Sequence, residues 1–191
     1  MSKIAVAKGI VQKKMLELLE KKYRVTINPK KLTTRVGEDI YFFVKHRDIP
    51  ELIENNIIDI GITSWEWIVE KNVKVDVVKK LDWCNTKICV IQNKDNYEQG
   101  NSCVTEFPNI AKLYFEENNK NVRIKKISGS SEAYVPLLAD MSVDCVETGN
   151  TLKENGLRIN TIILESKIVV CVKKGTKNLF YKYTEELFGN E

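Results

Sequence analysis

The chain has 191 residues, of which 43% are hydrophobic and 29% are charged, and its formal net charge is +4. A chain of this length and composition can bury one or two apolar cores without disulfide bonds. No apolar run reaches the roughly 18 residues that a membrane-spanning helix needs, and the N-terminus lacks the apolar stretch of a signal peptide. We therefore expect a cytoplasmic globular protein with no membrane partner.

The cysteines and the single histidine argue against a metal site or a disulfide framework. The five cysteines are odd in number, form no CxxC pair and mostly lie in or beside apolar segments, so we expect buried free thiols. His46 is the only histidine, so a metal site with several histidine ligands is not possible within one chain. We predict no metal held by the protein alone. Basic residues do not alternate with aromatic ones in any tract, so we expect no nucleic-acid partner.

Strand and helix patterns alternate through the first half of the chain. Asp48 and Ser64 are suited to cap the helices that follow them. The rhythm predicts a largely parallel sheet covered by helices. The predicted elements are a strand at 3–7, a helix at 11–22, a strand at 40–44, a helix that starts within 47–50 and has Pro50 in its first turn, a strand at 57–63, a helix at 65–71, and strands at 75–81 and 86–91.

A polar stretch at residues 92–101 then marks a shift in composition that is typical of a linker or hinge. The second half predicts strands at 102–105, 122–127 and 143–147, helices at 108–118, 133–139 and 179–188, and two strands within 161–172 that return to the first sheet. We therefore predict two α/β lobes, with residues 93–165 inserted between residues 1–92 and 166–191. Two crossings would join them, and the cleft between them is the expected ligand site.

Four strand-to-helix turns carry residue types that bind phosphate. In parallel sheets such turns lie at the carboxyl ends of strands, where helix N-termini offer free N–H groups to anions. The richest turn spans residues 144–151, because two acids that could hold ribose hydroxyls precede a Thr-Gly-Asn-Thr run. The other three also have structural interpretations: a tight turn at Gly9, close packing at Gly61, and a capping box at 128–132.

Residues 143–157 resemble the signature of ATP phosphoribosyltransferase, the first enzyme of histidine biosynthesis. Segments 4–9, 48–50, 59–63, 107–111 and 128–132 follow the family's order and spacing, so the resemblance covers nearly the whole chain. The length is similar to the family's short form. The resemblance implies a two-lobed α/β fold of the periplasmic-binding-protein-like (type II) class. It also implies a regulatory subunit related to histidyl-tRNA synthetase, and a homodimer or hetero-oligomer.

The implied reaction is attack of adenine N1 of ATP on C1 of phosphoribosyl pyrophosphate, with Mg²⁺ carried by the substrate phosphates. By the same resemblance, Lys8 would face pyrophosphate and Glu147 would hold the ribose hydroxyls as catalytic residues. The implied substrate-binding residues are Gly9, Lys30, Lys45, Gly61, Thr63, Ser128, Gly129, Ser130, Glu132, Asp144, Thr148, Gly149, Asn150 and Thr151.

Several positions depart from the family's pattern. Ile10 stands where an arginine is usual, and Glu106 stands where a basic residue is common. Lys30 and Lys45 replace arginines, whose bidentate grip on phosphate lysine cannot copy. These departures leave open a second interpretation, a catalytically weak paralogue that acts as a phosphorylated-ligand binding or regulatory module. A third is a solute-binding module for another ligand.

Overall fold

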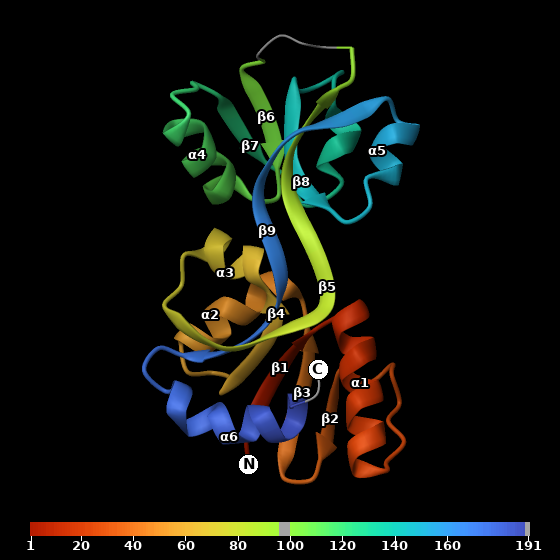
Figure 1. Cartoon of the computed structure of the whole chain (residues 1–191), viewed down its shortest axis with the longest axis vertical. Helices are drawn as coiled ribbons and strands as arrows, with labels where there is room; N and C mark the ends of the chain where they lie inside the picture. The colour runs from red at the N-terminus through yellow and green to blue at the C-terminus, as the bar shows by residue number, and fades with distance from the viewer. Residues whose placement is uncertain (96–99, 190–191) are drawn as a thin grey trace. The chain divides into compact units, whose positions relative to one another are not determined.

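A computed structural model describes residues 1–95 and 100–189, which fold as two compact units. Unit 1 contains residues 1–85 and the chain from Lys167 onward, and unit 2 contains residues 86–166. The chain passes from unit 1 to unit 2 within strand β5 (Val75–Asn93) and returns within strand β9 (Leu157–Lys173) (Figure 1). Both passages therefore run through regular strand backbone, and the two strands are neighbours in the strand order.

Unit 1 is built on a mixed sheet with the strand order β2-β3-β1-β4-β9. The strands are β1 (Lys3–Ala7), β2 (Thr33–Val36), β3 (Asp39–Val44) and β4 (Ile60–Ser64). β1 pairs in parallel with both β3 and β4, and its apolar run is buried, as a central parallel strand requires. The sequence did not indicate β2, which pairs antiparallel with β3. β9 also pairs antiparallel with β4, so only the centre of this sheet is parallel as predicted.

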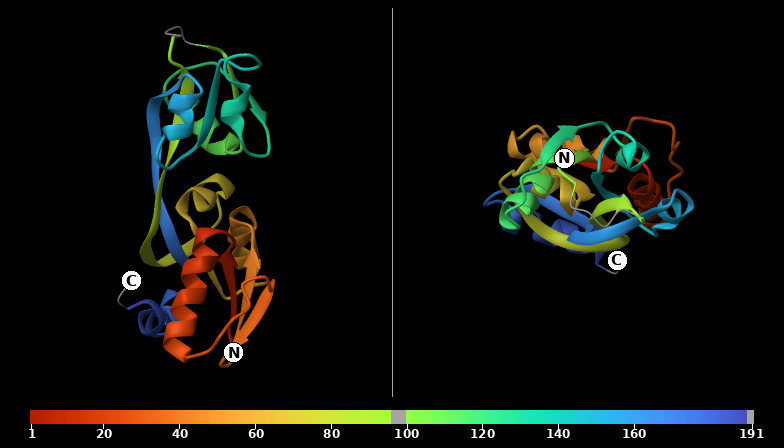
Figure 2. Two further views of the ribbon diagram at one scale, coloured as in Figure 1. Left: turned by 90° about the vertical axis from the view of Figure 1, so that its right-hand side faces the viewer. Right: turned by 90° about the horizontal axis from the view of Figure 1, so that it is seen from above.

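Helices cover this sheet. They are α1 (Ile10–Tyr23), α2 (Ile49–Glu54), α3 (Trp65–Lys71) and α6 (Lys177–Phe188), with a 3₁₀ turn η1 at His46–Asp48. α1 buries Val11, Met15 and Leu19 at helical spacing, and Figure 2 shows it lying along the strands of unit 1. Asp48 and Ser64 do stand at N-cap positions, but neither side chain forms a capping hydrogen bond.

Unit 2 has the strand order β9-β5-β8-β6-β7. It contains β6 (Ser102–Thr105), α4 (Pro108–Glu117), β7 (Arg123–Lys126), a 3₁₀ turn η2 (Ser131–Tyr134), β8 (Met141–Val146) and α5 (Asn150–Glu154). β6 is parallel to both β7 and β8, so the carboxyl ends of all three strands meet at one edge. The predicted phosphate turns of this unit follow those ends.

Three element predictions for the later chain were wrong. The helix expected at 133–139 is only the short turn η2, because Pro136 cannot donate the hydrogen bond that would continue it. The strands expected at 75–81 and 86–91 are one long strand, β5, and the two strands expected within 161–172 are one long strand, β9. The expected hinge at 92–101 links β5 to β6 within unit 2, and its residues 96–99 lie outside the described residues.

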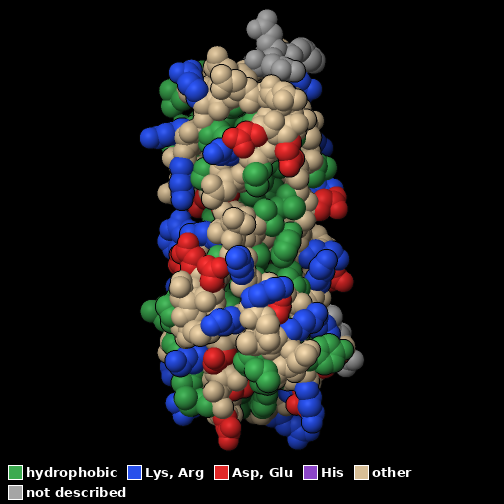
Figure 3. Space-filling view, turned by 90° about the vertical axis from the view of Figure 1, so that its left-hand side faces the viewer, with side chains coloured by type: hydrophobic (Ala, Val, Ile, Leu, Met, Phe, Trp, Pro, Cys, Tyr) green, Lys and Arg blue, Asp and Glu red, His purple; other side chains and the backbone are tan. Residues whose placement is uncertain are grey.

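The side-chain distribution tests the expectations from composition. All five cysteines are free thiols, but Cys145 is exposed, contrary to the expectation of burial. Lysines, arginines and acids are interspersed on the face that Figure 3 shows. None of the helices in residues 1–95 and 100–189 combines the length and the apolar character needed to cross a membrane.

Gly61 lies inside strand β4 and is buried, so the turn expected at residues 61–64 is wrong. A Cβ atom at this position would overlap Ile53 Cδ1 and would lie 2.6 Å from Ile49 Cγ2, both on helix α2. The absence of a side chain therefore allows α2 to pack directly on the strand. This finding agrees with the packing interpretation of Gly61.

We predict that Gly61→Ala lowers the free energy of unfolding by about 1–3 kcal/mol, because the added methyl group overpacks the contact with α2. Urea denaturation followed by circular dichroism measures the change. Ile53→Val removes the Cδ1 atom that the new methyl group would meet, so the double variant should lose less than the sum of the two single losses. A Gly61→Ala variant as stable as the wild type would contradict this packing.

Candidate functional site

The predicted phosphate turn of unit 2 lies exposed at the end of β8. Glu147 and Thr148 follow the strand, Gly149 adopts φ 74°, and α5 begins at Asn150. The left-handed backbone at Gly149 is one that glycine adopts without strain. The side chains of Glu147, Thr148, Asn150 and Thr151 are exposed. This turn therefore presents a carboxylate, two hydroxyl groups and the N-terminal turn of α5 to solvent.

Asp144 is already engaged within unit 2. Its Oδ2 atom accepts hydrogen bonds from Ser131 N, at 3.0 Å, and from Ser131 Oγ, at 2.5 Å. Its Oδ1 atom accepts a bond from the Cys145 N–H at 2.7 Å. Asp144 therefore ties the start of η2 to strand β8. Ser131, which the sequence analysis did not select, is fully buried and is the partner in this contact.

The loop at 128–132 lies among acidic groups. Burial raises the pKa of Glu132, and the neighbouring Asp144 carboxylate raises it further. On the other side, Glu106 Oε2 lies 4.0 Å from the position that a Cβ atom of Gly129 would occupy. The backbone there is left-handed at Gly129 (φ 85°) and at Ser130 (φ 51°). The structure thus gathers the predicted residues of 128–132 and 144–151 at one edge of unit 2, together with Glu106.

In unit 1, positively charged side chains follow adjacent strand ends. The backbone N–H of Lys8 donates to the carbonyl of Val44 at 2.9 Å, and Ala7 is paired with Val44 in register. Lys8 and Lys45, the residues after these two strands, are both exposed. Gly9 (φ 86°) then begins the 14-residue helix α1, whose first turn is a favourable place for an anion.

His46 forms a hydrogen-bonded cluster with the end of β4. Its Nδ1 atom lies 3.1 Å from Thr63 Oγ1, 3.2 Å from Ser64 N and 3.1 Å from Ser64 Oγ. Burial lowers the pKa of His46 to about 4, so the ring is neutral at physiological pH. Thr63 is fully buried, and its hydroxyl group donates to the His46 carbonyl at 3.1 Å. Thr63, predicted to bind substrate, is therefore bonded inside unit 1.

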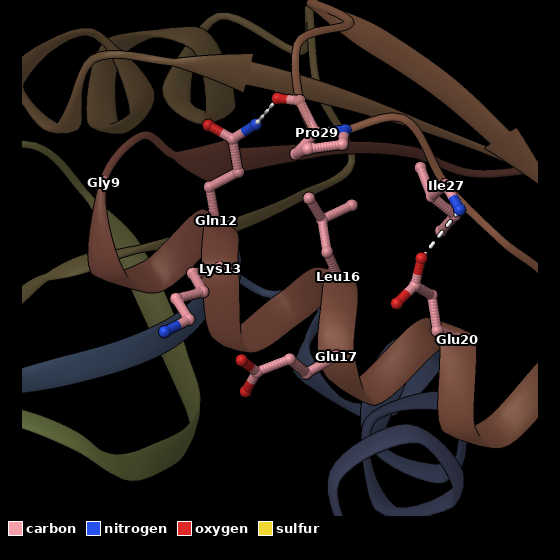
Figure 4. A pocket seen from close by; sticks show the side chains of 8 residues that line it. All are labelled: Gly9, Gln12, Lys13, Leu16, Glu17, Glu20, Ile27 and Pro29. Carbon is pink, nitrogen blue, oxygen red and sulfur yellow. Dashed lines mark hydrogen bonds between the residues drawn. The ribbon is translucent and has the colours of Figure 1, made fainter.

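Unit 1 also has a groove of about 410 Å³ between α1 and the segment that follows it (Figure 4). Gln12 Nε2 donates to the Pro29 carbonyl at 3.0 Å, and Glu20 Oε1 accepts a bond from the Ile27 N–H at 2.7 Å. Lys30, a predicted site residue, follows Pro29 and is exposed. The lining residues are Gly9, Gln12, Lys13, Leu16, Glu17, Glu20, Ile27 and Pro29.

The sequence analysis identified only Gly9 among these lining residues. The polar positions of α1 look like an ordinary solvated helix face, and only the return of residues 27–29 makes a groove of them. No local motif carries that signal.

A family model described as ATP phosphoribosyltransferase matches residues 45–189. The chain belongs to the ATP phosphoribosyltransferase family. The protein of that name from Alkaliphilus metalliredigens is 36% identical over 174 residues, which cover 85% of this chain and 83% of the relative. The protein of that name from Methanocaldococcus jannaschii is 31% identical over 183 residues, which cover 88% of this chain but only 63% of the longer relative.

Solved structures agree with this assignment to the ATP phosphoribosyltransferase family. A chain of the ATP phosphoribosyl transferase (HisG:HisZ) complex from Thermotoga maritima aligns with a TM-score of 0.84 at 25% identity, covering 99% of this chain and 96% of that one. The substrate binding protein of an amino acid ABC transporter aligns with a TM-score of 0.58 at 14% identity, covering 99% of both chains. The fold is therefore the α/β, periplasmic-binding-protein-like type II fold that the sequence predicted.

The family assigns an enzymatic function, the first step of histidine biosynthesis, to this chain. The second interpretation, a weak paralogue acting as a binding or regulatory module, is not favoured by these relatives. The individual site residues remain predictions, since a family match identifies no single contact.

We predict that Glu132→Gln raises the melting temperature at about pH 7 and that this gain shrinks towards about pH 4. The pKa of Glu132 is raised in the fold, so its stabilising protonated form is present below the pKa of the unfolded chain. That contribution is lost as the pH rises through the folded pKa, whereas glutamine stays neutral. Thermal melts of both proteins at the two pH values measure the difference. An equal gain at both pH values would contradict the raised pKa.

Proposed function

We propose that this chain is the catalytic subunit that joins N1 of ATP to C1 of phosphoribosyl pyrophosphate, and that residues 147–151 hold the phosphoribosyl group. The exposed turn at the end of β8 carries the proposal. Gly149 allows the chain to turn directly into α5, so the exposed residues Thr148 and Thr151 and the first turn of the helix lie within one short segment. A 5′-phosphate would accept hydrogen bonds from the hydroxyl and backbone N–H groups of residues 148–151. The carboxylate of Glu147 would accept bonds from the ribose hydroxyls.

Such a reaction asks for alignment and charge stabilisation more than for covalent chemistry. Negative charge develops on the pyrophosphate as it leaves. Lys8 and Lys45 follow paired strand ends, so their charges would act together on one polyanion. Gly9 would add the first turn of α1, and Lys30 a further charge. Each lysine would act as a point charge where an arginine would form two parallel bonds.

Two predicted roles are revised by position. Asp144 holds Ser131, so we propose that it shapes the 128–132 loop instead of binding ribose itself. Ser128, Gly129, Ser130 and Glu132 would then line the bound substrate from that loop. Thr63 and Gly61 would act through packing beneath the site in unit 1.

We propose that Mg²⁺ reaches the protein with phosphoribosyl pyrophosphate. Within residues 1–95 and 100–189, no three histidine, cysteine or acidic side chains converge on one point. An ion held mainly by phosphate oxygens and water, a mode that Mg²⁺ prefers, needs no such cluster of protein ligands. When bound, the ion would neutralise charge on the pyrophosphate.

We also propose that the chain works as the short form of the family with a separate regulatory subunit related to histidyl-tRNA synthetase. The likeness to a chain of the HisG:HisZ complex, over nearly the full length of both chains, supports this. The chain would then work in a hetero-oligomer, in which it could itself form a homodimer. We place this assembly in the cytoplasm.

The deciding experiment is an assay for phosphoribosyl-ATP. The purified chain is mixed with ATP, phosphoribosyl pyrophosphate and Mg²⁺, with and without the synthetase-like subunit of the same organism, and product is followed by its ultraviolet absorbance. We expect product, and more of it with the partner. No product under either condition would overturn the proposed function.

We predict that Thr151→Ala and Glu147→Ala each weaken phosphoribosyl pyrophosphate binding at least about tenfold, since hydrogen bonds to charged groups contribute about 1.5–3 kcal/mol. Titration calorimetry measures the affinity. Thr151→Ser keeps the hydroxyl group and should bind nearly as the wild type. Glu154→Ala removes an exposed acid from the end of the same helix and is the control for charge. Unchanged affinity in both alanine variants would rule out this turn as the binding site.

A further inference from the structure

His46 stands between two charged side chains and joins them to a buried cluster in unit 1. Lys45 precedes it and Arg47 follows it, at the end of β3 and the start of η1. Arg47 Nε also lies 3.9 Å from Asp48 Oδ1, in an ion pair near the surface. Lys8 lies beside this turn, because its N–H donates to Val44, the last residue of β3. Three cations therefore gather around the ends of β1 and β3. A site for a polyanion in this place depends on where the backbone at 45–47 is held.

Three hydrogen bonds in the cluster have a direction that follows from the donors available. The Ser64 hydroxyl donates to Glu66 Oε1 at 2.6 Å, and the Thr63 hydroxyl donates to the His46 carbonyl at 3.1 Å. The backbone N–H of Ser64 can only donate, and its acceptor at 3.2 Å is His46 Nδ1. With Nδ1 as this acceptor, the ring is neutral and carries its proton on Nε2.

This arrangement is not a catalytic triad, although it contains a serine, a histidine and an acid. Glu66 accepts a hydrogen bond from the serine hydroxyl, whereas the acid of a triad orients the histidine, and Ser64 and Glu66 are only 5% and 4% exposed. A nucleophilic serine needs a base that takes its proton and an open path to substrate. Here the serine hydroxyl donates its hydrogen bond to the carboxylate and not to the histidine, so the cluster connects backbone segments instead of activating a nucleophile.

The cluster links three parts of unit 1. His46 belongs to η1 after β3, Thr63 and Ser64 end β4, and Glu66 lies in the first turn of α3. Both the main chain and the side chain of His46 take part, through its carbonyl and its Nδ1 atom. The turn that carries Lys45 and Arg47 is thereby fixed to the end of the neighbouring parallel strands.

We propose that His46 is a positioning residue for pyrophosphate binding: Ser64 holds its neutral ring and Thr63 holds its carbonyl group, and together they fix the turn that carries Lys45 and Arg47. The proposal rests on the proposed function, since that function supplies the polyanion. His46 itself touches no substrate. Its contribution is to hold the backbone that carries Lys45 and Arg47 in one conformation, which lowers the entropic cost of binding.

The test compares two substitutions with a structural control. His46→Asn keeps an acceptor close to the place of Nδ1, whereas His46→Leu keeps the bulk and removes the acceptor. Tyr183→Phe is the control, because Tyr183 donates to Asp39 at 2.8 Å at the start of β3 and lies outside the proposed site. For each variant, the affinity for inorganic pyrophosphate is measured by calorimetry, KM and kcat by the product assay, and the melting temperature by circular dichroism.

We expect His46→Leu to weaken pyrophosphate binding about tenfold and to raise KM for phosphoribosyl pyrophosphate by a similar factor. His46→Asn should stay within about threefold of the wild type. Tyr183→Phe should lower the melting temperature without changing the affinity. If His46→Leu behaves like Tyr183→Phe, with lower stability and unchanged affinity and KM, the positioning role is overturned.

A spectroscopic measurement separates this proposal from the proposed function. Because the chain has one histidine, an untagged sample with ¹⁵N-labelled histidine gives imidazole signals from His46 alone. We expect the proton on Nε2 and a bare Nδ1. A proton on Nδ1 would overturn the cluster even if the enzyme is active. If the wild type binds no pyrophosphate and makes no product, the proposed function fails and the positioning role fails with it. The position of the imidazole proton still shows in that case whether the hydrogen-bonded cluster forms.

Discussion

Parallel pairing of short strands is the constraint on which the rest of this structure depends. In unit 1, β1 pairs with β3 and β4, and in unit 2, β6 pairs with β7 and β8, each time in parallel. Parallel strands end at the same edge, so the segments that follow them are brought together whatever their distance in the chain. The polar turns of both units lie at such edges. A change in register would separate them.

Buried polar contacts then hold these turns in place. In unit 2, Asp144 accepts two hydrogen bonds from Ser131, and in unit 1, His46 joins Thr63 and Ser64. In both cases a polar side chain at a strand end bonds the turn of a neighbouring segment. A buried polar group without a partner is costly, so such contacts favour one conformation of the turn over its alternatives.

Local patterns identified most of the elements and the family, but contacts distant in sequence were beyond them. The Thr-Gly-Asn-Thr turn at 148–151 was recognisable because strand, acid, glycine and helix start all lie within one short segment. Gly61 was ambiguous, because a phosphate turn and a close helix contact both call for glycine, and only the position of Ile53 decides between them. The helix expected at 133–139 failed because Pro136 outweighed the apolar pattern. The groove along α1 and the bonds of His46 join segments that no local pattern connects.

The sequence by itself determined the α/β class, the family and the exposed turn after β8, because each depends on residues that are neighbours in the chain. Only the tertiary structure decided that Asp144 holds a loop, that Thr63 is buried, and that the lone histidine is a neutral acceptor at the end of a strand. The physical reason is that a polar side chain takes its role from the donors and acceptors around it. Folding brings those partners from other strands, so their identity cannot be read from the residue and its neighbours alone.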